Sequence, residues 1–70
     1  MDDTKYKLIS KRIRLARNTL GFSQEYIAQE LGISQSVYSN NERNVKNIPL
    51  YRLEQIAKIL GVSIIKLLED

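Results

Sequence analysis

The feature that most constrains the fold of this chain is a triplet of glycine, an apolar residue and serine that occurs three times. The copies begin at Gly21, Gly32 and Gly61 and read Gly-Phe-Ser, Gly-Ile-Ser and Gly-Val-Ser. Glycine adopts the left-handed conformation that ends many helices, and the following serine can accept a hydrogen bond from the first N–H groups of a new helix. Each triplet therefore predicts a joint between one helix and the next.

Apolar residues between these joints recur at the three- and four-residue spacing of helices. They predict a first helix over about residues 7–20. Pro49 suits the start of a later helix, because the N–H group that proline lacks would have no partner in the first turn. Residues 44–48 carry no such period and are expected to form a loop, and no segment alternates as a strand would. We therefore expect an all-α fold of five helices. The residues that mark them are, in chain order, Ile9, Ile13, Ala16 and Leu20; Tyr26 or Ile27, Ala28 and Leu31; Val37 and Tyr38; Leu50, Leu53, Ile56, Ala57 and Leu60; and Ile64, Leu67 and Leu68.

Composition excludes several classes of site. The 70 residues include neither cysteine nor histidine, so we expect no disulfide, no metal site and no cofactor. Short helices offer little cleft in which carboxylates or serines could act, so we do not expect an enzyme. The charged first residues do not resemble a secretory signal, and no stretch is long enough to span a bilayer. The chain is expected to form one domain over residues 1–70 of a soluble, cytoplasmic protein.

Positive charge is concentrated at the start of the sequence. Eleven Lys and Arg against eight Asp and Glu give a net charge of +3. A local positive field favours a polyanion as partner, although a basic helix face that merely keeps the protein in solution would look the same. The early basic residues are Lys5, Lys7, Lys11, Arg12, Arg14 and Arg17, opposed there only by Asp2 and Asp3.

The joint at residues 32–34 links two short helices through very few residues. Helices on such a turn cross steeply, as in a helix-turn-helix unit, which we place at about residues 23–42. An ordinary corner between two helices would have the same turn. The outer face of the following helix therefore has to distinguish a DNA-binding helix-turn-helix unit from such a corner. That face carries short hydroxyl and amide side chains, which match base edges in the major groove, whereas a solvated face would more often carry Glu and Lys. These side chains are Gln35, Ser36, Ser39, Asn40 and Asn41.

With these residues the sequence resembles the Cro/C1-type helix-turn-helix family, also called the xenobiotic-response-element family. The resemblance runs from about Ile9 to Leu68 and implies a five-helix, lambda-repressor-like domain that regulates transcription, often as a repressor, by binding double-stranded DNA. Residues 42–44, followed by Asn47-Ile48, resemble the controller proteins of restriction–modification systems. The matching residues are Lys11-Arg12-Ile13-Arg14, Arg17, Gly21-Phe22-Ser23-Gln24-Glu25, Ala28, Leu31-Gly32-Ile33-Ser34-Gln35-Ser36, Glu42-Arg43, Leu53, Ile56-Ala57 and Leu60-Gly61-Val62-Ser63.

The resemblance also implies roles for individual residues. Arg17 and Glu42 would form an internal ion pair between the first helix and the end of the third, although two unconnected surface charges would give the same sequence. The expected base-reading residues are Gln35, Ser36, Asn40 and Ser39. The expected phosphate contacts are Ser23, Gln24, Ser34, Arg43 and Lys46.

Three positions depart from the family pattern. Asn41 stands where an apolar residue is common, so we expect its amide to form a hydrogen bond or the helix to pack differently. Tyr38 replaces an aliphatic residue, and we interpret it as part of the core. Asn44 replaces a glycine, and we expect it to adopt the left-handed conformation that asparagine tolerates.

Two apolar residues, Tyr51 and Ile65, fall outside the stripes that face the core. Single exposed apolar residues are normal, but two on neighbouring helices favour a self-complementary patch. We therefore expect a homodimer that joins through Tyr51, Ile64 and Ile65 and reads a pseudo-palindromic operator, with no membrane or small-molecule partner. The alternative is an antitoxin-like or other partner-binding module that keeps this fold with little DNA affinity.

Overall fold

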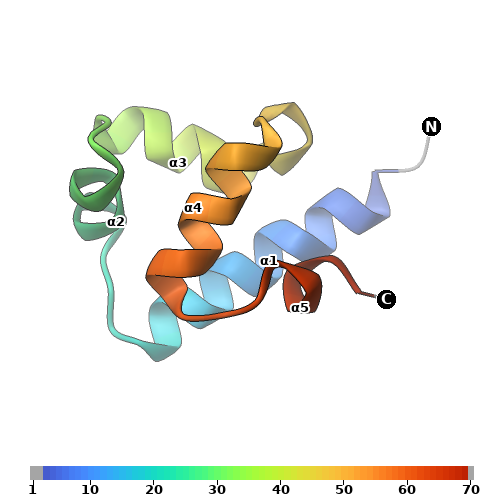
Figure 1. Ribbon diagram of the computed structural model, residues 1–70. Coiled ribbons are helices and arrows are strands. Elements are labelled where there is room, and N and C mark those ends of the chain that lie inside the picture. The colour runs from blue at the N-terminus through green and yellow to red at the C-terminus, as the bar shows by residue number, and fades with distance from the viewer. Residues whose placement is uncertain (1–2, 70) are drawn as a thin grey trace.

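The computed structural model describes residues 3–69, which form five α-helices and one short 3-10 turn (Figure 1). Helix α3 lies along the upper edge of the view in Figure 1, α1 crosses behind α4, and α5 lies to the right of the lower end of α4, beside α1. The longest helix has 16 residues, and none within residues 3–69 is long and apolar enough to cross a membrane. The predicted all-α fold of five helices is confirmed. The elements are α1 Thr4–Thr19, α2 Gln24–Leu31, α3 Gln35–Arg43, η1 Val45–Asn47, α4 Leu50–Leu60 and α5 Ile64–Leu68.

All three glycine joints are built as the sequence predicts. The glycines have φ angles of 74°, 72° and 69°, in the left-handed region that side chains other than glycine rarely adopt. A Cβ at any of them would meet nothing within 4 Å, so backbone conformation rather than space requires glycine. Ser23, Ser34 and Ser63 then accept hydrogen bonds from N–H groups at the start of α2, α3 and α5. Local sequence therefore marks where these helices end and begin.

The core takes one fully buried side chain from each of the first four helices. These are Ile13 of α1, Ile27 of α2, Tyr38 of α3 and Ile56 of α4. The expectation that Tyr38 is a core residue is confirmed. Leu67 adds a buried side chain from α5, and the apolar residues of the three joints pack against the same core.

Several expectations at helix ends were wrong. Helix α1 begins at Thr4 rather than near residue 7, because the lysines before Ile9 are good helix formers and nothing interrupts them. The expected end of this helix near residue 20 agrees with the structure, where Leu20 is the C-cap of α1 and is 48% exposed. Leu50 is the first residue of α4 and is 62% exposed, although the apolar spacing placed it in the buried stripe.

The expected loop at residues 44–48 is also more ordered than the sequence predicted. It contains the 3-10 turn η1, and Val45 is buried. Asn44 has φ -119°, and no described residue other than glycine has a positive φ, so the expected left-handed conformation is wrong. A right-handed 3-10 turn follows α3 directly and does not need a left-handed residue. Asn44 instead bonds back to Asn40 through both its backbone N–H and its side chain.

A side chain of α1 holds α5 in place. The guanidinium of Arg12 donates to the carbonyl oxygens of Leu67 at 2.9 Å and Glu69 at 2.5 Å. These carbonyls lie at the C-terminal end of a five-residue helix, where intrahelical donors are missing and positive charge is favourable. Because so short a helix is not stable alone, α5 depends on Arg12 and on burial of Leu67.

The burial pattern of α1 predicts unequal effects of two truncations. Ile13→Val removes one methylene from a fully buried side chain and should lower the free energy of unfolding by about 0.5–1.5 kcal/mol. Leu15→Ala removes more atoms, but Leu15 is 63% exposed, so the loss should be about 0.5 kcal/mol or less. Urea denaturation of both variants measures this difference. A larger loss for Leu15→Ala would contradict the described core.

Candidate nucleic-acid interface

Helix α3 is packed so that one face is buried and the opposite face is open to solvent. Tyr38 and Glu42, one helical turn apart, are its buried residues, and α3 packs mainly against α2. Of the residues predicted from the sequence to read bases, Ser36 and Asn40 lie on the side opposite Tyr38, whereas Gln35 lies in the first turn, on the side of Tyr38. Gln35, Ser36 and Asn40 are exposed, and Ser39 is half-buried.

The carboxylate of Glu42 is the centre of a buried polar network. Arg17 of α1 donates to both its oxygens, with Nε 2.8 Å from Oε2 and Nη2 3.2 Å from Oε1. The Tyr38 hydroxyl donates to Oε2 at 2.7 Å, and Gln24 Nε2 of α2 donates to Oε1 at 3.2 Å. The Arg17 and Glu42 side chains are only 11% and 4% exposed, so this is a buried ion pair rather than two surface charges.

This network changes the protonation equilibria of its members. Burial alone would raise the pKa of Glu42, but hydrogen bonds from Arg17, Tyr38 and Gln24 stabilise the carboxylate and lower the pKa below its usual value. Burial raises the pKa of Tyr38, and the hydrogen bond to Glu42 raises it further. The hydrogen bond to Glu42 also raises the pKa of Arg17. The ionised pair and the neutral phenol are therefore the stable forms at neutral pH.

Sequence reasoning predicted only the Arg17–Glu42 pair of this network and missed the hydrogen bonds of Gln24, Ser10 and Tyr38 to Glu42. The buried Ser10 hydroxyl of α1 donates to the backbone carbonyl of Glu42, which ties α1 to the last turn of α3. The Tyr38 hydroxyl was not assigned a partner, although its four-residue spacing from Glu42 on a helix was a usable signal. Arg17 Nη1 also donates to the carbonyl of Phe22 at 3.0 Å and so fixes the first joint.

The structure brings several of the sequence-predicted contact residues into one hollow. Gln24 of α2 lines it together with Gln35, Ser36, Ser39 and Arg43 of α3. Amide, hydroxyl and guanidinium groups thus surround an open, polar depression beside the exposed face of α3. Such a surface can donate to and accept from a nucleic acid.

The remaining predicted contacts have partners within the chain. The Ser23 and Ser34 hydroxyl oxygens accept from the N–H groups of Tyr26 and Val37, which leaves the hydroxyl protons available to donate. Lys46 Nζ lies 3.0 Å from Asp3 Oδ1 at an exposed position. These predicted phosphate contacts therefore lie at the start of α2, at the start of α3 and in η1, which follows α3.

Asn41 joins α3 to α4. Its Oδ1 accepts a hydrogen bond of 3.1 Å from Arg52 Nη1, so the expectation that its amide forms a hydrogen bond is confirmed. Arg52 also lies over the ring of Tyr51, with its guanidinium carbon 5.9 Å from the ring centre. The hydrogen bond between Asn41 and Arg52 therefore joins α3 to α4 at a position where the family commonly has an apolar residue.

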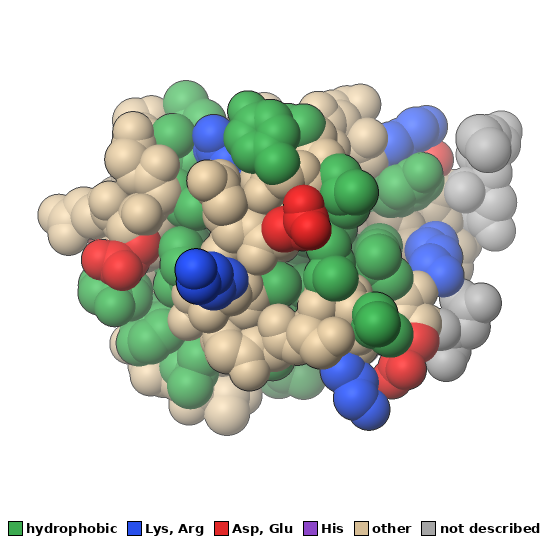
Figure 2. Space-filling model, in the orientation of Figure 1, with side chains coloured by type: hydrophobic (Ala, Val, Ile, Leu, Met, Phe, Trp, Pro, Cys, Tyr) green, Lys and Arg blue, Asp and Glu red, His purple; other side chains and the backbone are tan. Residues whose placement is uncertain are grey.

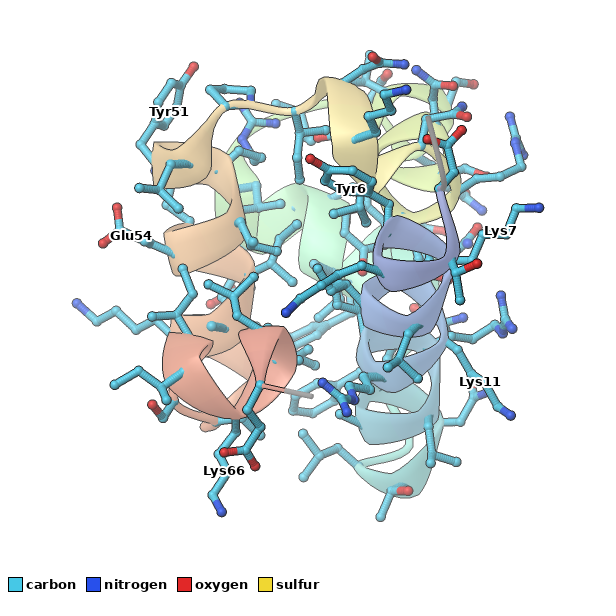
Figure 3. All side chains as sticks on the ribbon, turned by 90° about the vertical axis from the view of Figure 1, so that its right-hand side faces the viewer. Tyr6, Lys7, Lys11, Tyr51, Glu54 and Lys66 are labelled. Carbon is cyan, nitrogen blue, oxygen red and sulfur yellow. The ribbon has the colours of Figure 1, made fainter. Side chains whose placement is uncertain are left out.

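A second face, formed by α4 and α5, is apolar. Ile65 is 69% exposed and Tyr51 59% exposed, and the neighbouring Ile64 is half-buried. Figure 2 shows hydrophobic side chains gathered over these helices on the side turned to the viewer. In Figure 3, Tyr51 and Glu54 project to one side of the molecule while Lys7 and Lys11 of α1 project to the other. The apolar face and the basic side of α1 are thus opposed.

Comparison with known proteins finds helix-turn-helix regulators and control proteins. A family model described as helix-turn-helix matches residues 13–67. The chain is 30% identical over 70 residues to control protein C.MunI of a Mycoplasma species, covering all of this chain and 95% of the relative. It is 32% identical over 62 residues to control protein C.SmaI of Serratia marcescens, covering 89% of this chain and 74% of the relative. An uncharacterised HTH-type transcriptional regulator of Sinorhizobium medicae is 36% identical over 62 residues, which is 89% of this chain but only 45% of that longer protein. No solved structure is significantly similar to the chain.

The Glu42 network predicts a pH-dependent stability. The folded-state pKa of Glu42 lies below its unfolded value of about 4.3. The stabilisation that the ionised carboxylate gives to the fold is therefore fully present above about pH 4.3. It is lost as the pH falls through the folded-state pKa. Glu42→Gln leaves the Arg17 charge unmatched and should lower the free energy of unfolding by about 3–5 kcal/mol at neutral pH.

Urea denaturation of the wild type and Glu42→Gln at a series of pH values measures this dependence. The difference in free energy of unfolding between them should be constant at neutral and mildly acidic pH and should shrink below about pH 4.3. A difference that stays the same down to the lowest pH would show that ionisation of Glu42 does not stabilise the fold.

Proposed function

Because the chain belongs to the Cro/C1-type helix-turn-helix family of DNA-binding transcriptional regulators, we propose that it binds a pseudo-palindromic operator as a homodimer, with α3 of each subunit in the major groove. Members of this family are regulators rather than enzymes. The observation that carries the proposal is the exposed polar face of α3, which the buried Glu42 network turns away from the core.

The base-reading residues are on the exposed face of α3. Gln35 and Ser36 lie in its first turn, the part of a recognition helix that contacts base edges. The amides of Gln35 and Asn40 can pair with N6 and N7 of adenine, and the hydroxyls of Ser36 and Ser39 can pair with several bases. Asn40 Oδ1 already accepts a hydrogen bond of 2.6 Å from Asn44, which orients its amide before DNA arrives.

The phosphate contacts surround this reading face. Ser23 and Gln24 lie at the start of α2, where N–H groups and the helix dipole favour an anion, and Ser34 lies at the start of α3. Arg43, exposed at the end of α3, and Lys46 of η1 supply positive charge on the other side. Such contacts position the protein on the backbone without specifying a sequence.

The apolar face of α4 and α5 is the proposed dimer interface. Tyr51, Ile64 and Ile65 would meet the same residues of a second copy across a twofold axis. The interface would bury apolar surface that a chain of this size lacks in its own core. Two copies of α3 about 34–36 Å apart would then contact successive major grooves on one side of the DNA.

The functional class closest to the observations is that of the control proteins. C.MunI and C.SmaI are both named so, and this chain covers most of the length of each. The sequence at residues 42–44 and 47–48 also resembles restriction–modification controllers. We therefore assign the chain to this class in preference to an antitoxin-like partner-binding module.

Gln35→Ala tests the proposed function directly. The change should weaken binding to the preferred duplex by about 1–3 kcal/mol for each half-site and relax the preference at one base pair of each half-site, with little effect on a scrambled duplex. Gln29→Ala, the same substitution at an exposed position of α2, is the matched control and should leave both affinities unchanged. Fluorescence anisotropy at fixed salt measures each affinity. Equal losses on the two duplexes would remove Gln35 from base reading, and no binding to either would favour a partner-binding module.

Ile65→Lys tests the dimer. The charge would be buried at the proposed interface, so the variant should sediment as a folded monomer and bind a two-half-site duplex more weakly despite its added positive charge. Leu15→Lys makes a similar change at an exposed leucine of α1 and should remain dimeric. An Ile65→Lys variant that sediments as a dimer would place the interface on another surface.

A further inference from the structure

A polar hollow lies between the start of α1 and the end of α3. Its lining includes three cationic side chains from three different elements, namely Lys7 of α1, Arg43 of α3 and Lys46 of η1. Tyr6 adds a phenol, and the one carboxylate in the lining is that of Asp3. A cluster of cations from separate elements around an open hollow suits an anion with several oxygens.

The position of Asp3 is unusual for its residue type. Asp3 is the N-cap residue of α1, where an aspartate commonly accepts hydrogen bonds from the first-turn N–H groups and contributes about 0.5–2 kcal/mol. Here its side chain makes no capping hydrogen bond. Its Oδ1 lies instead 3.0 Å from Nζ of Lys46, which is far away in the sequence. Asp3 therefore gives up a local interaction to place a carboxylate among the cations of the hollow.

The hollow adjoins the proposed reading face. Arg43 lines both this hollow and the one formed by Gln24, Gln35, Ser36 and Ser39. DNA that follows the exposed face of α3 would therefore bring its backbone past Arg43 and toward Lys46. In Figure 3 the Lys7 side chain projects to the side opposite Tyr51, so a dimer through the apolar face that includes Tyr51 would leave Lys7 accessible.

We propose that this hollow binds a DNA backbone phosphate flanking the base pairs read by α3, and that the Asp3 carboxylate occupies it in the free protein as an internal competitor. This proposal rests on the proposed function. The phosphate would take the place of the carboxylate on Lys46, and Asp3 would then be able to turn to the N-terminus of α1 and cap it. Both side chains are 47% exposed, and an ion pair of such exposure is weak enough for a phosphate to displace.

Asp3→Asn tests the competition. Asparagine is as good an N-cap as aspartate but carries no charge, so the variant should fold normally and bind DNA about two- to fivefold more tightly. The gain should be equal on the preferred and the scrambled duplex, because phosphate contacts carry no sequence information. It should shrink as the salt concentration rises, since salt already weakens an exposed ion pair. Thermal unfolding followed by circular dichroism checks that the fold is retained.

Two further variants show whether Asp3 acts through Lys46. Lys46→Gln should weaken binding to both duplexes and reduce the slope of log affinity against log salt by about 2, because the dimer loses one phosphate contact in each subunit. In the Lys46→Gln background, Asp3→Asn should no longer tighten binding. Glu30→Gln, at an exposed position of α2, makes the same change in net charge and should leave the affinity unchanged.

Each outcome decides the proposal. A gain from Asp3→Asn that persists without Lys46, or that Glu30→Gln reproduces, would reduce the effect to net charge and overturn it. The absence of any gain, or wild-type affinity in Lys46→Gln, would overturn it as well. These results leave the role of α3 untouched, because that role is measured by the loss of sequence preference in Gln35→Ala. If the wild type binds neither duplex, the proposed function itself fails.

Discussion

The arrangement of this molecule depends on one buried carboxylate. Glu42 carries a negative charge into a nearly inaccessible position, and such a charge is tolerated only when it is paired and fully hydrogen-bonded. Its donors come from different helices, with Arg17 on α1, Gln24 on α2 and Tyr38 on α3. The requirement to compensate one charge therefore fixes three helices relative to each other. It also sets the rotation of α3 about its axis, which turns the polar side chains of Ser36 and Asn40 outward.

Most of the helical framework could be predicted because its signals are local. A glycine that needs a positive φ and a serine that caps the next helix act within a few residues, and all three joints formed as expected. Expectations failed at element ends, where periodicity says little about burial. Leu50 has the spacing of a core residue but lies in the first turn of α4, beyond the edge of the core. Val45 was assigned to a loop because one buried residue in a 3-10 turn leaves no periodic pattern.

The types of residue at the candidate site could be predicted from the sequence, but most of their hydrogen-bond partners could not. The exposed amide and hydroxyl row of α3 followed from helical spacing, because buried Tyr38 and Glu42 determine which side faces solvent. The partners of Gln24 and Ser10 could not be predicted, since both bond to a residue of another helix. The contact between Asp3 and Lys46 joins the two sides of the polar hollow across most of the chain, and no local pattern marks it. Long-range polar contacts of this kind depend on the assembled fold.

The proposed function requires α3 to read base pairs in the major groove as one of two symmetric copies. Selection of bound sequences from a pool of random duplexes tests it most directly, because the selected sites report both the bases read and their arrangement. A symmetric dimer should select an inverted repeat whose half-sites are centred about 10–10.5 base pairs apart, or a multiple of that distance. Enrichment of a single unrepeated motif would contradict the symmetric dimer, and recovery of no preferred sequence would contradict base reading by α3.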